Sequence, residues 1–206
     1  MIDLAGRTRA FHELEPLRAI AIVGIGNLLL SDDGVGIHAV RALRSESRVG
    51  PVARLIDGGT VGTDLLAAVW GCARLLIIDA VDAGLPPGST IRMDFDGSGP
   101  QKIDTRNAHQ SGIPGLLDDM RLLGCAPRQV VLVGVQPATL EVRTELSPEV
   151  AAALPVLAGE VVRQVERWMA AEGAAISAIQ IQASLAPAHG GAAEQISGTE
   201  QLRQCI

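Results

Sequence analysis

The sequence predicts an α/β fold, a three-layer α/β/α sandwich around a twisted, mostly parallel sheet of about five strands. Short unbroken runs of Val, Ile, Leu and Ala recur along the chain, as in strands that are buried on both faces. Segments with a helical spacing of apolar residues separate these runs. The connections are short, which is typical of right-handed β-α-β crossovers.

Four apolar runs are the predicted inner strands. The first, AIAIV, closes at Gly24, and the others lie at 52–56, 75–78 and 130–135. The segment Ser89–Phe95 alternates apolar and polar residues instead, which predicts a strand at the edge of the sheet. The pattern leaves open whether this edge strand runs parallel or antiparallel to its neighbour.

Helices are predicted between the strands, at 35–43, 63–70 and 113–123. The last helix is expected to begin at Ser147-Pro148-Glu149, because Ser is a good N-cap, Pro suits the first turn and Glu faces the positive helix end. Its pattern runs to about Glu172, and Pro155 is expected to kink or split it.

Three segments follow from this pattern. Residues 1–17 form a polar leader, residues 18–172 form one domain, and residues 173–206 are predicted to be a mobile tail rich in Ala, Gly, Gln and Ser. Within the tail, AISAIQIQASLA has the composition of a short helix or strand.

Composition excludes several classes of function. With a net charge of −6, 2 Phe, 2 Trp and no Tyr, the chain lacks the basic face and stacking side chains of a nucleic-acid-binding protein. It has no apolar run of membrane-spanning length, and its start has no apolar core of the signal-peptide type. The odd set Cys72, Cys125 and Cys205 indicates a reducing compartment with buried thiols. We therefore expect a cytoplasmic protein. A monomer is expected as well.

Polar residues follow the predicted strands at one edge of the sheet, where open parallel sheets bind ligands. Asp32 and Asp33 follow the first strand, Asp57 the second, Asp79 the third, and His109 lies in the loop before the helix at 113–123. Several carboxylates and one imidazole are thus predicted to converge at this edge.

The stretch GIGNLLLSDDGVG, residues 24–36, begins like a dinucleotide-binding loop. The third glycine of the G-x-G-x-x-G pattern is replaced by Leu29, however, and two carboxylates stand where a phosphate would bind. Because like charges repel in a half-buried cleft, the stretch disfavours a nucleotide.

Asp33, Asp79 and His109 have the oxygen and nitrogen donors that a borderline divalent metal such as Zn, Ni, Mn or Fe takes, but they are predicted on three separate loops and their spacing defines no metal motif. Structural alternatives remain open for these acids and their neighbours. One of Asp32 and Asp33 is expected to cap a helix, and Asp57 before Gly-Gly-Thr fits an Asx turn equally well. The three other histidines, His12, His38 and His189, are expected to be structural or exposed residues and not ligands.

Six motifs in order resemble one family, the hydrogenase maturation endopeptidases. They are GIGNLLLSDDGVG, DGGT at 57–60, LIIDA at 76–80, HQSG at 109–112, VGVQP at 133–137 and LSP at 146–148. The resemblance covers about residues 18–170 and implies the same three-layer fold. It implies one cleavage that removes a C-terminal extension from a nickel–iron hydrogenase large-subunit precursor, after nickel has been inserted.

Carried onto this sequence, the family's metal-binding positions are Asp33, Asp79 and His109. The resemblance implies that nickel arrives with the precursor, so that no permanently bound cofactor is expected. Some members have Glu at the first position, and the shorter Asp33 reaches about one methylene less far. Asp57 is expected to lie next to these metal-binding residues without binding the metal itself. The four glycines of GIGNLLLSDDGVG are expected to let the backbone approach the substrate or turn sharply.

In the resulting hypothesis, nickel held by the precursor docks on Asp33, Asp79 and His109 and positions the peptide to be cut. The sequence leaves open whether nickel polarises the carbonyl or a carboxylate activates water. Two alternatives are kept: a non-catalytic metal- or precursor-binding chaperone of the same fold, and an α/β enzyme acting on a nucleoside or nucleotide.

Overall fold

The computed structural model describes residues 19–60, 63–95 and 108–185, and for residues 63, 108–111 and 172–185 it describes only the helical backbone. The predicted leader and residues 186–206 of the predicted tail lie outside this part of the chain. Two compact units are distinguished, one ending at Val162 and the other beginning at Arg163. The first unit contains the sheet and every candidate site residue, and the second contains the later turns of the last helix.

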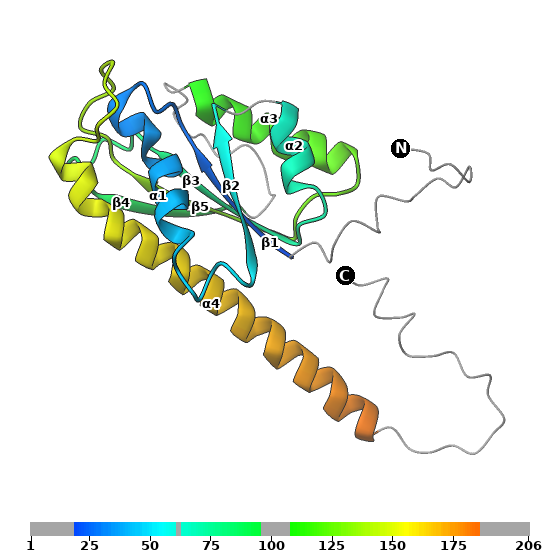
Figure 1. Cartoon of the computed structure of the whole chain (residues 1–206). Coiled ribbons are helices and arrows are strands. Elements are labelled where there is room, and N and C mark those ends of the chain that lie inside the picture. Colours follow the sequence, from blue (N-terminus) through cyan, green and yellow to red (C-terminus); the bar gives the residue numbers. More distant parts are fainter. Residues whose placement is uncertain (1–18, 61–62, 96–107, 186–206) are drawn as a thin grey trace, which may run out of the picture. The chain divides into compact units, whose positions relative to one another are not determined.

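Five strands form one sheet in the order β2-β1-β3-β5-β4 (Figure 1). Their bounds are β1 Ile20–Ile25, β2 Ala53–Gly59, β3 Arg74–Ala80, β4 Thr90–Phe95 and β5 Gln129–Val135. β1, β2, β3 and β5 run parallel to one another, and β4 is antiparallel to β5 at one edge of the sheet. The predicted fold class is confirmed, and the open direction of the edge strand is settled as antiparallel.

The inner strands are buried on both faces, which explains their unbroken apolar sequences. All six residues of β1 are buried, as are all but the first residue of β3 and of β5. β4 alternates half-buried and exposed residues, so only one of its faces packs on the protein. Burial on two faces therefore holds for β1, β3 and β5. The run at 52–56 was also predicted to be buried on both faces, but this prediction is wrong, because β2 lies at the other edge of the sheet and most of its residues are only half-buried.

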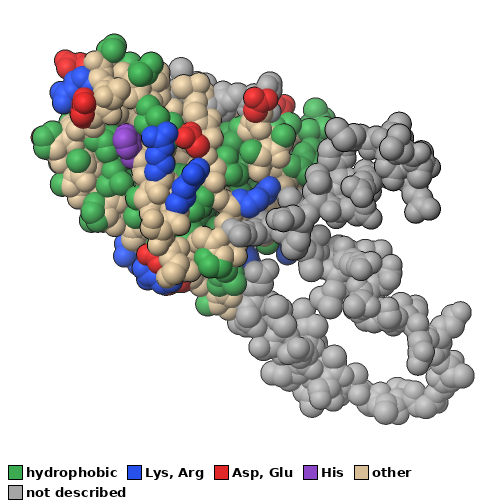
Figure 2. Space-filling model, in the orientation of Figure 1, with side chains coloured by type: hydrophobic (Ala, Val, Ile, Leu, Met, Phe, Trp, Pro, Cys, Tyr) green, Lys and Arg blue, Asp and Glu red, His purple; other side chains and the backbone are tan. Residues whose placement is uncertain are grey.

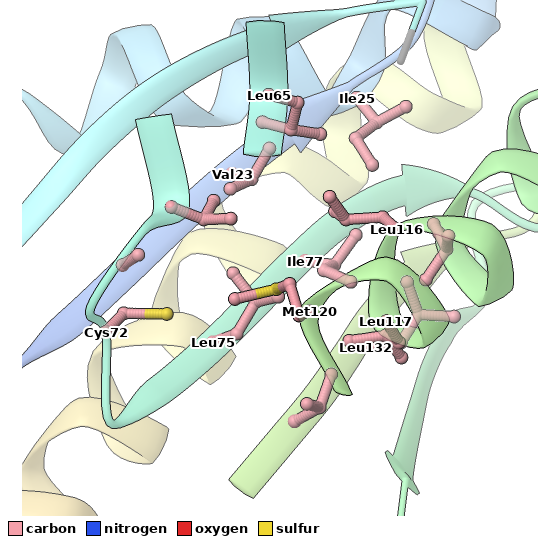
Figure 3. Close-up of a cluster of buried hydrophobic side chains, with 14 of the residues drawn as sticks. Val23, Ile25, Leu65, Cys72, Leu75, Ile77, Leu116, Leu117, Met120 and Leu132 are labelled. Atoms are coloured by element: carbon pink, nitrogen blue, oxygen red, sulfur yellow. The ribbon is translucent and has the colours of Figure 1, made fainter. Parts of the chain in front are cut away.

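Helices α2 (Thr63–Val69) and α3 (Ala108–Leu122) cover one face of the sheet, and α1 (Val35–Leu43) lies on the other (Figure 1). The core under α2 and α3 joins both helices to the strands. Figure 3 shows the side chains that meet there, among them Leu65 of α2, Met120 of α3, Val23 of β1, Ile77 of β3 and Leu132 of β5. Buried Cys72 belongs to the same cluster, as expected for a thiol that serves as a small apolar side chain.

The last helix, α4, spans Pro148–Leu185 without interruption, so Pro155 does not split it. Pro155 lies on the exposed face, whereas Val150, Leu157 and Val161 form a buried apolar stripe on either side of it. Continuous burial of this stripe offsets the helix hydrogen bond that proline cannot donate. The helix also continues past Glu172, into the segment for which the sequence left a short helix or strand open.

No helix in the described ranges is both long enough and apolar enough to span a membrane. On the face of the molecule in Figure 2, acidic and basic side chains occur together among apolar ones. This mixed surface agrees with the charge balance of the sequence and differs from the continuous basic face that nucleic acid requires.

Candidate functional site

The glycine-rich stretch after β1 is folded tightly against its own backbone. Gly26 has a φ of 140°, and its N–H donates a 2.8 Å hydrogen bond to the carbonyl oxygen of Gly59. A Cβ added at Gly26 would stand 1.7 Å from the backbone oxygen of Asp33. Residue 26 must therefore be glycine for the carboxylate-bearing turn to close over the end of β1.

Gly24 and Gly36 allow a second close approach, between α1 and the sheet. A Cβ at Gly24 would lie 2.1 Å from the oxygen of Gly36, and one at Gly36 would lie 2.2 Å from the oxygen of Ile78. The sequence predicted that the glycines of this stretch let the backbone approach a substrate or turn sharply, but the space beside Gly24 and Gly36 is filled by the chain itself. Their observed role is to bring the start of α1 onto the ends of β1 and β3.

Asp33 lies in a short 3-10 helix, η2 (Ser31–Gly34), that leads directly into α1. The residue is 3% exposed, and its Oδ2 accepts a 2.8 Å hydrogen bond from the backbone N–H of Asn27. The loop that carries Asp33 therefore also fixes the orientation of its carboxylate.

Asp79 is the second buried carboxylate, next to last in β3 and 1% exposed. Its Oδ1 accepts a 2.8 Å hydrogen bond from the N–H of Ala80. β1 ends alongside β3, with Gly24 paired to Ile78, and η2 contacts β3. The fold thus brings the elements that bear Asp33 and Asp79 together at the carboxyl edge of the sheet, as the sequence predicted.

Asp32 has a different role from its neighbour. It is completely buried, and its two oxygens accept hydrogen bonds from three backbone N–H groups, those of Ala138, Thr139 and Ser147. Neither Asp32 nor Asp33 makes a side-chain cap on η2 or α1, so the expected helix-capping role is wrong. Asp32 instead binds the segment between β5 and α4, more than a hundred residues away in the chain.

Asp57 forms the Asx turn that was one of its two predicted roles. It lies within β2 and is exposed, and its Oδ1 accepts a 3.3 Å hydrogen bond from the N–H of Gly59. Its Oδ2 lies 3.5 Å from an Arg41 guanidinium nitrogen. These contacts explain Asp57 as a turn-forming residue, and its placement behind the metal-binding positions stays a prediction.

His109 lies in the first turn of α3, since that helix begins at Ala108, and not in a loop before the helix. Its side chain is outside the described part of the chain, so its place beside Asp33 and Asp79 stays a prediction. His38 is on α1, with its Nε2 buried and without a hydrogen-bond partner among the described residues. Burial, and then the nearby Arg41 charge, lower the pKa of His38.

Gln136 is a buried polar residue whose role was missed, although it lies in the predicted motif after β5. Its Oε1 accepts hydrogen bonds from the N–H groups of Ala83 and Leu85, at 2.8 and 3.2 Å, and its Nε2 donates to Asp82 at 3.2 Å. One glutamine thereby orders the loop that follows Asp79. A polar residue directly after an apolar strand was the available signal, but its partners are 51 to 54 residues away.

Among the described side chains no group of three His, Cys, Asp or Glu could hold a metal ion. Two of the three predicted ligands, Asp33 and Asp79, are buried carboxylates on adjacent elements at this edge. Two oxygen donors suit a borderline divalent cation that brings further ligands of its own. The arrangement defines an α/β protein with an acidic site at the carboxyl ends of its parallel strands.

Comparison with known proteins gives the family of this α/β protein. The sequence model of the hydrogenase maturation proteases matches residues 37–164, and the chain belongs to this family. It is 40% identical over 150 residues to the hydrogenase expression/formation protein HupM of Azotobacter chroococcum, covering 68% of this chain and 71% of the relative. It is also 40% identical over 124 residues to HoxM of Cupriavidus necator, covering 59% of this chain and 61% of that relative.

Solved structures agree with this assignment. The hydrogenase-maturating endopeptidase HybD of Escherichia coli superposes with a TM-score of 0.66 and 29% identity, over 72% of this chain and 92% of that protein. The maturation protease HybD of Thermococcus kodakarensis has a TM-score of 0.57 at 27% identity, over 71% and 98% of the two chains. Both share the fold described above.

Proposed function

We propose that this protein is an endopeptidase that removes the C-terminal extension of a nickel–iron hydrogenase large-subunit precursor after nickel insertion. Membership of the maturation protease family supports the reaction class. The observation that carries the proposal is the pair of buried carboxylates, Asp33 and Asp79, at the carboxyl edge of β1 and β3. Nickel belongs to the substrate in this proposal, and the precursor supplies its remaining ligands.

Burial makes these carboxylates selective for a positively charged partner. A metal ion that loses water beside Asp33 and Asp79 is attracted more strongly than it would be in bulk solvent. A precursor without nickel offers no such charge, and its docking would leave two buried acids facing a neutral segment. Recognition of loaded over empty precursor follows from this difference. His109, in the first turn of α3, is the proposed third contact to the metal.

The chemical step is hydrolysis of one peptide bond. Water adds its hydroxyl to the carbonyl carbon, the C–N bond breaks, and the released amine takes up a proton. The chain's own contribution is to hold the metal-bearing segment against Asp33, Asp79 and His109 so that one bond of the precursor is fixed at the site. Hydrogen bonds from Asn27 to Asp33 and from Ala80 to Asp79 hold both carboxylates in place before the substrate arrives.

The decisive experiment mixes the purified chain with large-subunit precursor, either nickel-loaded or nickel-free, and follows the intact mass of the subunit. Loss of a C-terminal peptide from the loaded precursor alone is the expected result. Cleavage of both forms at equal rates would contradict recognition through nickel.

The same assay distinguishes the alternatives. Stable binding of the precursor without any change in mass would favour a maturation chaperone of the same fold. Stabilisation by a nucleotide, with no binding of precursor, would favour the nucleotide enzyme. The packing of Asp33 against Gly26 opposes that last outcome, because backbone atoms occupy the space beside the glycine-rich turn.

A further inference from the structure

The segment between β5 and α4, residues 138–147, is held at both of its ends by one buried side chain. Asp32 Oδ2 accepts hydrogen bonds from the N–H groups of Ala138 and Thr139, at 2.8 and 3.1 Å. Its Oδ1 accepts one from Ser147, at 2.7 Å, directly before α4 begins. Hydrogen bonds to an ionised carboxylate are stronger than neutral ones, and here three of them converge on a residue with no exposed surface.

The residues just before Asp32 hold the middle of the same segment. The Ser31 N–H donates to the Arg143 oxygen at 2.7 Å, and the Arg143 N–H donates to the Leu29 oxygen at 3.0 Å. The Ser31 hydroxyl donates to the Glu145 oxygen at 2.8 Å. Ser31 has a φ of 48°, a left-handed conformation that is rare for residues other than glycine. This turn directs Ser31 and Asp32 towards the segment.

The next residue, Asp33, turns to a different partner. Its carboxylate binds the N–H of Asn27, on its own loop, instead of residues 138–147. The two adjacent aspartates thus have different roles, since Asp32 binds the distant segment and Asp33 lies at the candidate site. The segment is consequently fixed to the same short turn that carries Asp33.

The surface formed by this pairing exposes three apolar side chains, two of which alternate along the segment with the exposed charged residues Glu141 and Arg143. Leu29, Leu140 and Val142 are 61%, 40% and 83% exposed, and all three belong to the two hydrogen-bonded stretches beside Asp33. Apolar side chains on this scale of exposure, next to a site that must receive a polypeptide, are suited to contact an apolar stretch of that polypeptide. We call this surface, made by Leu29, Leu140 and Val142, the side wall.

We propose that Asp32 is a positioning residue, which holds residues 138–147 so that the side wall aligns the precursor's chain with Asp33. The inference rests on the proposed function, because it names the part of the protein that receives the same substrate. Asp32 itself touches neither precursor nor metal. Its effect passes through the three backbone N–H groups that it binds.

Amide hydrogen exchange tests the first half of the proposal. In Asp32→Asn one oxygen is replaced by an amide that cannot accept a hydrogen bond, so at least one of the N–H groups of Ala138, Thr139 and Ser147 loses its partner. We expect exchange in residues 138–147 to become at least about tenfold faster while the amides of β1, β3 and β5 keep their protection. Unchanged exchange in the segment would overturn the holding role of Asp32.

Cleavage of nickel-loaded precursor tests the second half. We expect Asp32→Asn to raise the KM for precursor about tenfold or more and to change the single-turnover rate at saturation by less than about threefold. A merely structural role would lower the amount of active protein and leave KM unchanged. The matched control is Asp94→Asn, an exposed carboxylate on β4 that pairs with Arg92.

Variants of the side wall keep the test decisive if Asp32→Asn folds poorly. Leu140→Ser and Val142→Ser alter exposed side chains and leave the bonds to Asp32 in place, and together they are expected to raise KM at least about threefold. Leu122→Ser, at the end of α3 and about as exposed as Val142, is the matched control. Normal cleavage with an unchanged KM would overturn the positioning role alone, whereas a wild-type chain that leaves loaded precursor intact would overturn the proposed function and this role together.

Discussion

The backbone oxygen of Asp33 occupies the position that a side chain at Gly26 would need, only 1.7 Å from an ideal Cβ. This contact joins the first motif of the sequence to the candidate site. The glycine is required because the turn that carries Asp33 closes against it, at a φ that other residues avoid.

Gly26→Ala is therefore expected to lower the free energy of unfolding by about 2–4 kcal/mol and to impair processing by displacing Asp33. Urea unfolding monitored by circular dichroism measures the stability. Gly115→Ala is the control, since no atom lies within 4 Å of a Cβ at this position in α3. This change is expected to raise stability by about 0.5–1 kcal/mol. Equal stability of Gly26→Ala and the wild type would contradict the packing argument.

Asp33→Asn and Asp79→Asn separate the charge of the site from its shape. An asparagine can still accept the hydrogen bond that Asn27 gives to Asp33, or that Ala80 gives to Asp79, but it lacks the negative charge. We expect each variant to remain folded and to lose at least about a hundredfold in the rate of precursor cleavage. Asp118→Asn, at an exposed carboxylate paired with Arg121, should cleave normally. Wild-type rates in both site variants would remove the carboxylates from the mechanism.

His109→Ala tests the third position that the family resemblance implies. We expect the variant to fold normally, because the change lies in the first turn of α3, and to lose processing of loaded precursor. Thermal unfolding and the subunit mass assay give the two measurements. Arg121→Ala on the same helix is the control and is expected to process normally, since its ion pair with Asp118 is exposed. Retained processing in His109→Ala would exclude the histidine from the site.

The buried thiol of Cys72 leads us to expect a loss of stability in alkaline solution. Burial raises the pKa of its thiol to about 11, above the ordinary value of 9.0. As the pH rises, the thiol loses its proton in the unfolded chain before it does so in the folded protein. The neutral buried thiol therefore contributes fully to the free energy of unfolding below pH 9, and this contribution is lost as the pH rises to about 11. The loss is roughly 2 kcal/mol.

Cys72→Ala should flatten this part of the stability–pH profile, measured by urea unfolding at several values between pH 8 and 11. The sequence has no tyrosine, so few other side chains titrate in the same range. An unchanged alkaline slope in Cys72→Ala would show that the thiol does not cause the decline.

Much of the fold was predictable because its signals are local. The predicted bounds of the helix at 35–43 match α1, and the expected N-cap is confirmed, since Ser147 Oγ accepts a 3.3 Å hydrogen bond from the Val150 N–H. Unbroken apolar runs gave the parallel strands, and alternation gave the edge strand. Pro155 was expected to kink or split the last helix, and a split does not occur. The penalty of proline is a local signal in the sequence, whereas the burial of the stripe that sustains α4 across it depends on the fold.

The candidate site was predictable in part. Asp33 and Asp79 follow from the rule that parallel strands end at one edge, and the structure places their elements together there. The family resemblance assigned the metal-binding position to Asp33, but the residues themselves gave no separate role to Asp32, since both are aspartates in the same turn. One of the two was expected to cap a helix next to it, but the partners of Asp32 are 106 to 115 residues away.

The sequence by itself determined the α/β class, the order and approximate positions of the strands and helices and, through its six motifs, the resemblance to a family that the comparisons confirm. These features depend on the periodicity and the order of residues, which can be seen in neighbouring residues of the sequence. Only the tertiary structure decided that Asp32 fastens residues 138–147 while Asp33 remains at the edge of the sheet. The physical reason is that the role of a buried carboxylate is set by the N–H groups that surround it after folding, and here a left-handed Ser31 and a glycine contact direct two identical side chains to different partners.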